Sequence, residues 1–102
     1  MIVFNTTFHI EEGIHEEFIE YMLQVFIPMS TKSRILTSPR LARVHGKEEE
    51  EGLSFAMEFQ VANLIALEQW NSEESQLVYP PLLEKFKEKL AGFSTVMETI
   101  SY

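Results

Sequence analysis

The sequence contains no cysteine among its 102 residues. Disulfide bonds and thiolate chemistry are therefore excluded, which fits a reducing compartment, and we expect a cytoplasmic protein. Basic residues are also few, since 8 Lys and Arg stand against 16 Asp and Glu and leave a net charge of -8. Because a phosphate backbone and an anionic lipid surface both require a basic face, we expect neither nucleic acid nor a membrane among the partners.

Long apolar runs are missing as well. The opening stretch Met1–Thr7 has no basic start and no long apolar run, so we expect neither a signal peptide nor a membrane span. The chain does contain 45% hydrophobic residues, including eight Phe. That is ample for one packed core, so we expect a single acidic domain over residues 1–102.

The clearest pattern is a strict alternation over residues 53–61. Its odd positions are all large and apolar, whereas its even positions are Ser, Ala, Glu and Gln. This period of two predicts a strand with one face in the core. Further strands are predicted over residues 2–10, 41–47 and 93–100. The inward face of the last strand stays open, because Phe93 and Met97 compete for it with Val96 and Ile100.

Two stretches with apolar residues at helical spacing predict helices. The first runs from Ile14 to about Phe26, and Pro28 is expected to end it. Asn63 is suited to the N-cap of the second helix, which is predicted over about residues 64–71.

Proline and glycine predict the breaks that follow. Tyr79, Pro80 and Pro81 are expected to interrupt the chain, with Pro81 opening a further helix and Gly92 following its end. Residues 46–52 contain four consecutive Glu. Because like charges repel when packed, this segment is expected to form a solvated hairpin tip.

The order of these elements is β-α-β-β-α-β. This order predicts an α+β ferredoxin-like sandwich, with a four-stranded antiparallel sheet and helices on one face. The other face of the sheet mixes polar and aliphatic residues. We expect it to pair with a second copy of the chain, giving a homodimer with a polar-lined cavity between the two sheets.

The register of the predicted hairpin places the polar residues on this open face. A turn centred on Glu49-Glu50 would set His45 opposite Ser54. It would also put Arg43 on the open face, as a diagonal neighbour of Glu58.

Five polar residues on the open face are candidate ligand-binding residues: Asn5, His9, Arg43, His45 and Glu58. Glu58 with Arg43 is either an acid–base or anion-binding pair, or an ion pair that fixes the register. His9 and His45 could ligate a metal, but their backbones would lie about 10 Å apart and a third ligand is not evident. We therefore predict no metal site.

Several segments together resemble a known family. They are Met-Ile-Val-Phe-Asn at residues 1–5, Phe-Ile-Pro at 26–28, Arg-Leu-Ala-Arg-Val at 40–44, and Leu-Glu-Lys-Phe at 83–86 before a last strand that contains Phe93. With these segments the chain resembles the dimeric α+β-barrel superfamily, and within it a small bacterial family of uncharacterised function. The resemblance implies a homodimer of ferredoxin-like subunits and no assigned activity.

The same superfamily holds cofactor-free and haem-degrading monooxygenases, which resemble this chain at Asn5 and Trp70. The haem-degrading members also carry an iron-ligating His about ten residues beyond the Trp. This chain has Pro80 there, after Tyr79, so we expect no haem and no other cofactor. Trp70 and Tyr79 either line a ligand pocket or pack in the core beside Leu67.

The sequence contains no Ser-His-Asp set, phosphate-binding glycine loop or zinc spacing, so no catalytic residue is assigned. The preferred hypothesis is a homodimer, non-enzymatic or of uncharacterised activity, that binds a small ligand between its sheets or serves as an assembly module. The alternative is a cofactor-independent monooxygenase or isomerase that uses Asn5, His9, Arg43 and Glu58. Convergence of these groups on an enclosed cavity would favour the enzyme.

Overall fold

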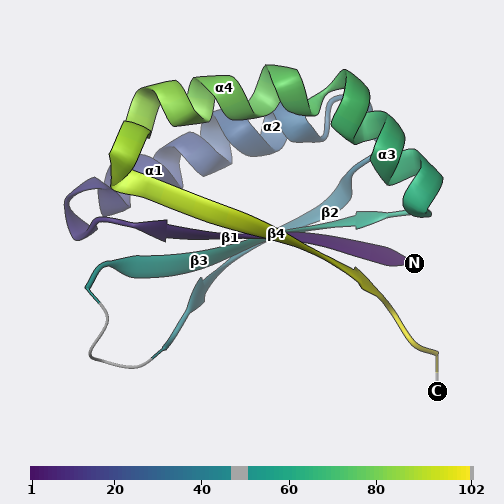
Figure 1. The fold of residues 1–102 in the computed structure, drawn as a ribbon, viewed down its shortest axis with the longest axis horizontal. Coiled ribbons are helices and arrows are strands. Elements are labelled where there is room, and N and C mark those ends of the chain that lie inside the picture. Colours follow the sequence, from purple (N-terminus) through teal and green to yellow (C-terminus); the bar gives the residue numbers. More distant parts are fainter. Residues whose placement is uncertain (47–50, 102) are drawn as a thin grey trace.

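A four-stranded antiparallel sheet lies under one layer of helices in the computed structural model, which describes residues 1–46 and 51–101 (Figure 1). The strand order is β2-β3-β1-β4, as a ferredoxin-like fold requires. The strands are β1 (Ile2–Ile10), β2 (Thr37–Val44), β3 (Leu53–Val61) and β4 (Leu90–Glu98). The predicted fold class is therefore confirmed.

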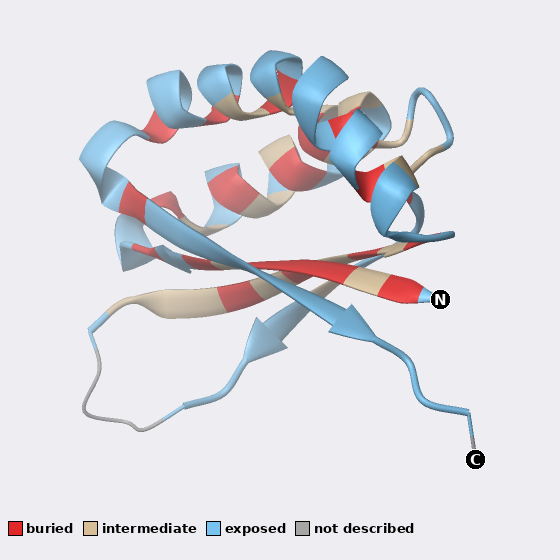
Figure 2. Ribbon diagram, turned by 45° about the vertical axis from the view of Figure 1, so that its right-hand side comes forward, coloured by how far each residue is buried: buried red, intermediate tan, exposed pale blue. Residues whose placement is uncertain are grey.

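The two central strands, β1 and β3, have the predicted bounds and the predicted inward faces. The odd residues of β3 from Phe55 to Val61 and the even residues Ile2, Phe4, Phe8 and Ile10 of β1 are buried under the helices. Figure 2 shows the burial running along the inner side of the helices and these two strands, while β2 and β4 are largely exposed. The period of two was therefore sufficient to place the core.

The first helical run does not end at Pro28, contrary to the prediction. A short turn (η1, Glu12–Ile14) leads into α1 (His15–Tyr21), a π-helical stretch (η2, Met22–Phe26) and α2 (Ile27–Ser30). In the π-helical stretch, the N–H of Ile27 bonds to the carbonyl of Met22, five residues back. The wider turn gives room for the ring of Pro28, which would clash with the previous turn of a regular α-helix.

The second helical run also continues through its prolines, contrary to the prediction. Asn63 caps α3 (Leu64–Glu73) as predicted, because its side chain accepts a hydrogen bond of 2.8 Å from the N–H of Ala66. The break falls at Glu74, and α4 (Ser75–Phe86) contains both Pro80 and Pro81. Both prolines face solvent, where water can bond the carbonyls that lose their helical donors.

The last strand begins three residues earlier than predicted. Lys87, at a φ of 51°, ends α4, and a short turn (η3, Lys87–Lys89) leads into β4. Gly92 is therefore not the residue after a helix. It lies opposite Phe8, whose Cδ1 would be only 3.0 Å from a Cβ at this position. The ring of Phe8 covers the glycine backbone at this point of the sheet.

The open question about the faces of β4 is settled by its register with β1. Phe93 pairs with Thr7 and Met97 with Val3, so both apolar side chains lie on the face away from the helices. Val96 lies on the helix side.

The register of β2 differs by one residue from the predicted one. Arg40 is opposite Glu58, so Arg43 is opposite Phe55 and lies on the helix side instead of the open face. His45 lies just beyond the end of β2 and is not opposite Ser54. The predicted turn at residues 49–50 lies outside the described residues.

The amino-acid pattern of β2 explains this error. Leu41 and Val44 lie on opposite faces, so the alternation in this strand does not choose between the two registers. The observed register sets Leu41 opposite Met57, where it packs against the core. A bulge between Thr37 and Arg40, with Ser38 at a φ of 49°, adjusts the strand upstream.

None of the helices in the described part of the chain is long and apolar enough to cross a bilayer.

Candidate functional site

The face of the sheet opposite the helices, called the open face below, has a polar row across its middle. The row runs over all four strands through Arg40, Glu58, Asn5 and Thr95. Arg40 Nη2 lies 3.2 Å from Glu58 Oε1 and donates a hydrogen bond of 3.3 Å to Oε2. The predicted partner of Glu58 was Arg43. Arg40 was missed because the strand was predicted to begin at Leu41, with a register one residue away from the observed one.

A double-mutant cycle tests this pairing. The coupling free energy between Arg40→Ala and Glu58→Ala should be about 0.2–1 kcal/mol, as for other exposed ion pairs. Arg43→Ala should show no coupling with Glu58→Ala, because Arg43 lies on the other side of the sheet. Urea denaturation of the wild type, the three single variants and the two double variants measures both values. Coupling to Arg43 alone would contradict the observed register.

Asn5 is the unusual member of the row. It is only 8% exposed although it lies on the open face. Its Nδ2 donates a hydrogen bond of 3.1 Å to Thr7 Oγ1, but its buried Oδ1 has no partner among the described residues. An unpaired buried acceptor costs about 1–3 kcal/mol. The chain therefore keeps a destabilising group at the centre of the open face.

Apolar side chains flank this row. Phe93 is 66% exposed and Met97 is also exposed, and both stand on the open face. Val44 is exposed at the far edge, on β2. The open face thus mixes apolar and polar side chains, as the sequence predicted, but Val44 was expected on the helix side and the faces of Phe93 and Met97 had been left open.

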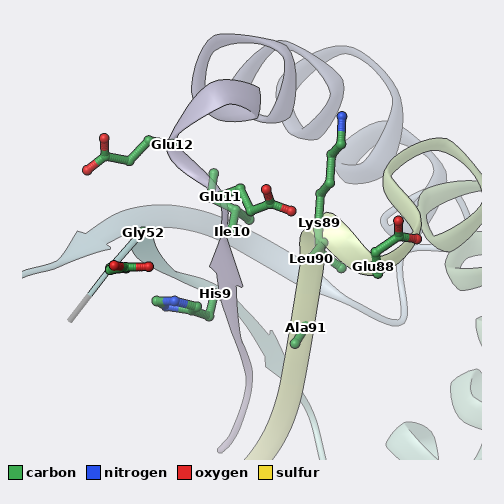
Figure 3. Close-up of a pocket in the computed structure, with 10 residues that line it drawn as sticks. His9, Ile10, Glu11, Glu12, Gly52, Glu88, Lys89, Leu90 and Ala91 are labelled. Carbon is green, nitrogen blue, oxygen red and sulfur yellow. The ribbon is translucent and has the colours of Figure 1, made fainter.

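A hollow of about 580 Å³ lies where β1 ends and β3 and β4 begin (Figure 3). Its lining residues are His9, Ile10, Glu11, Glu12, Glu51, Gly52, Glu88, Lys89, Leu90 and Ala91. His9 is the one residue of the predicted ligand set that reaches it. The imidazole is held in place by a hydrogen bond of 3.0 Å between Nδ1 and Ser54 Oγ.

The charge of this hollow is mostly negative. Four glutamates line it, against one lysine, Lys89. In Figure 3, Glu11 and Glu12 follow the end of β1 and Glu88 precedes β4, with Ile10 and Leu90 between them. A neutral or cationic molecule with an apolar part fits this lining better than an anion does. Sequence reasoning missed the hollow because residues 88–91 were not recognised as the end of a turn and the start of β4.

Trp70 and Tyr79, the predicted pocket-lining pair, lie together between the helices and the sheet. Their ring centroids are 6.2 Å apart, and Trp70 Nε1 donates a hydrogen bond of 3.0 Å to the carbonyl of Ser30. The hydroxyl of Tyr79 lies 3.4 Å from Thr6 Oγ1, which lies 3.0 Å from Ser94 Oγ. Burial raises the pKa of Tyr79, and the hydrogen bonds from Thr6 and Ser94 partly oppose this shift.

The structure thus separates the predicted site residues into distinct places. Asn5 and Glu58 share the central row of the open face, whereas His9 lies four residues further along β1, at the end of this face. Arg43 is on the helix side and His45 lies beyond β2. No local signal in β2 chooses the observed register, because the alternation of this strand fits both registers.

Comparison with known proteins gives a family and a fold. The model of a domain of unknown function, DUF4286, matches residues 1–100. No curated protein matches the chain. A dimeric ferredoxin-like protein from an uncultured marine organism has a TM-score of 0.71 and 16% identity, covering 99% of this chain and 96% of its own.

Two further solved structures resemble the chain. An ethyl tert-butyl ether D (EthD) family protein from Bacillus halodurans has a TM-score of 0.66 and 16% identity, covering 98% of this chain and 100% of its own. A mutant of MhuD with two manganese protoporphyrin IX molecules per active site has a TM-score of 0.71 and 10% identity, covering 100% and 97%. At these identities the similarity shows the ferredoxin-like fold alone.

Proposed function

The chain belongs to the DUF4286 family, whose function is unknown, and from this premise we propose that it pairs through the open face into a homodimer that binds a small ligand. The observation that carries the proposal is the exposure of two large apolar side chains, Phe93 at 66% and Met97 at 42%, on either side of the polar row. Aromatic and methionine side chains are enriched in protein interfaces. Pairing would remove both side chains from water.

A second copy on the open face would also change the polar row. It would cover the row that contains Asn5 and Glu58 and bring donors or ordered water to that region. The marine protein of similar fold is described as dimeric. That description supports the pairing of two such subunits.

The ligand is proposed to bind in the hollow at the end of the open face. Its volume of about 580 Å³ falls in the range of small-molecule sites. The second copy would provide the missing wall, because His9 and Ala91 of the hollow lie on the open face. The four glutamates favour a neutral or cationic ligand.

The alternative, a cofactor-independent monooxygenase or isomerase, has less support from this geometry. Glu58 is opposite Asn5, four residues along β1 from His9. Four residues of a strand span about 13 Å, so the two groups do not converge on one reacting atom. Arg43 lies on the other side of the sheet.

The proposed ligand is not a porphyrin, although the MhuD mutant of similar fold binds one. The position at which the resemblance places the iron-ligating His is Pro80, which has no side-chain donor atom. The neighbouring Tyr79 directs its hydroxyl to Thr6.

The homodimer is tested by placing a charge at the centre of the open face. Ala56 lies opposite Thr7 and Ala42 there. Ala56→Lys should halve the number of chains in the assembly, because a buried unpaired ammonium is costly. Ile65→Lys is the matched control, since Ile65 is 80% exposed on α3 in the helix layer and should tolerate the same charge.

Native mass spectrometry of the purified protein measures this effect. The same spectra show whether a small molecule is retained by the wild type and lost with Ala56→Lys. An unchanged number of chains in Ala56→Lys would contradict pairing through the open face. A paired wild type that retains no small molecule would leave the homodimer and argue against the ligand.

A further inference from the structure

The two edges of the sheet differ in how they are protected against pairing with other strands. The edge strand β2 carries Pro39, a bulge, and the charged residues Arg40 and Arg43. These are the devices by which natural sheets prevent edge-to-edge association. In contrast, β4 pairs with β1 without a bulge over nine residues, contains no proline or basic residue, and has a single charge at its end, Glu98.

Hydrogen bonds at both ends of β4 show which of its backbone groups are free. The N–H of Thr99 bonds to the carbonyl of Met1, and the carbonyl of Lys89 accepts from the N–H of Glu11, each at 3.0 Å. In an antiparallel pair, residues alternate between bonding to the neighbour and pointing away from it. The odd residues of β4 therefore bond to β1, and the even residues, from Leu90 to Glu98, direct their N–H and C=O groups to the free edge.

Exposed apolar side chains flank this free edge on both faces of the sheet. On the open face they are Phe93 and Met97, and on the helix side Val96 is 48% exposed. A strand added to this edge would be covered by apolar contacts above and below.

We propose that the free edge of β4 pairs with β4 of a second copy of this chain in an antiparallel ladder centred on Ser94. In this ladder the outward groups of Gly92 and Val96 bond to each other across the two-fold axis. Glu98 falls opposite Leu90 of the second copy, so the two carboxylates lie at opposite ends of the ladder and do not repel. The edge of β2 fits less well, because its proline and bulge interrupt a ladder.

This pairing uses the edge of β4, whereas the homodimer uses the open face, and a closed assembly that contains both interfaces has four chains. The pairing also accounts for the lack of protecting residues on β4. Closed assemblies of four identical chains with two kinds of two-fold interface are common among soluble proteins.

The test removes one outward donor from β4. Val96→Pro deletes an N–H that the free edge uses and β1 does not, so the bonds between β1 and β4 remain. Native mass spectrometry should find half as many chains as in the wild type. Val96→Thr keeps the N–H and the branched shape, and it should keep the wild-type number. The double variant Ala56→Lys with Val96→Pro should be a single chain.

Hydrogen exchange of the unmodified protein gives a readout that needs no variant. The amides of Gly92, Ser94 and Val96 should exchange slowly in the assembly, like the odd residues of β4 that bond to β1. Fast exchange at these three positions would overturn the edge pairing, as would a wild-type number of chains in folded Val96→Pro. Either result with a halved number in Ala56→Lys would leave the open-face homodimer intact.

Discussion

Replacing Trp70 with Ala should lower the free energy of unfolding by about 3–5 kcal/mol. Trp70 is fully buried, and its ring packs at 5.9 Å from that of Phe4 and at 6.2 Å from that of Tyr79, measured between centroids. Truncation leaves a cavity between α3 and the sheet and removes the donor to the Ser30 carbonyl. Since domains of this size are stabilised by about 5–15 kcal/mol, this loss is a large share of the total.

Urea denaturation followed by circular dichroism measures the effect, because the variant lacks the single tryptophan of the chain as a fluorescent probe. Trp70→Phe is the matched control. It keeps an aromatic ring but leaves the carbonyl of Ser30 unpaired, so about 1–3 kcal/mol should be lost. A cost for Trp70→Ala no larger than that of Trp70→Phe would show that ring packing is not the main contribution.

Gly52→Ala should lower the free energy of unfolding by about 2–5 kcal/mol. Gly52 has a φ of 88°, and a Cβ there would lie 2.5 Å from the carbonyl oxygen of Ile10 and 2.9 Å from His9 Nε2. Left-handed backbone costs an alanine about 1–2 kcal/mol. Overpacking against a backbone oxygen adds about 1–3 kcal/mol, because the backbone of β1 cannot move aside as a flexible side chain can.

Gly13→Ala provides the comparison within the same chain. A Cβ at Gly13 would have no neighbour within 4 Å, and its φ is not in the left-handed region. This variant should be neutral or stabilised by about 0.4–1 kcal/mol, because alanine reduces the entropy of the unfolded chain. Thermal unfolding of the two variants side by side measures the difference. Equal stabilities would show that the close approach of Gly52 to β1 is not a constraint.

The fold was predictable wherever local pattern and tertiary packing agree. The alternation of β3 from Leu53 to Val61 gave its bounds without error, and Asn63 marked the start of α3 through a contact only three residues away. Both signals are local. The alternation of β3 also identifies the residues of this strand that form the core beneath the helices.

The predictions were wrong where packing overrides a local rule. Pro28, Pro80 and Pro81 lie inside helices, because the π-helical stretch makes room for the first and solvent hydrates the carbonyls near the others. Gly92 lies within a strand, where the ring of Phe8 leaves little room for a side chain. No residue close in the sequence indicates the surroundings of these prolines or of Gly92.

The candidate site was less predictable than the fold. Its residues depend on the register of β2, and β2 has too little alternation to fix one. The open face itself, with Asn5 and Glu58 at its centre, followed from the sequence. Two features could be identified only from the three-dimensional structure. One is that Arg40, and not Arg43, pairs with Glu58. The other is the hollow that includes Lys89.

The pairing of β1 with β4 also has a consequence for the order in which the chain folds. Ile2 of the central strand lies opposite Glu98. Closing so long a loop is entropically costly and slow, so contacts between β1 and β3 can form before those with β4. During synthesis on the ribosome, the edge of β1 that pairs with β4 would stay free until β4 emerges. A free strand edge of this kind favours association with other chains.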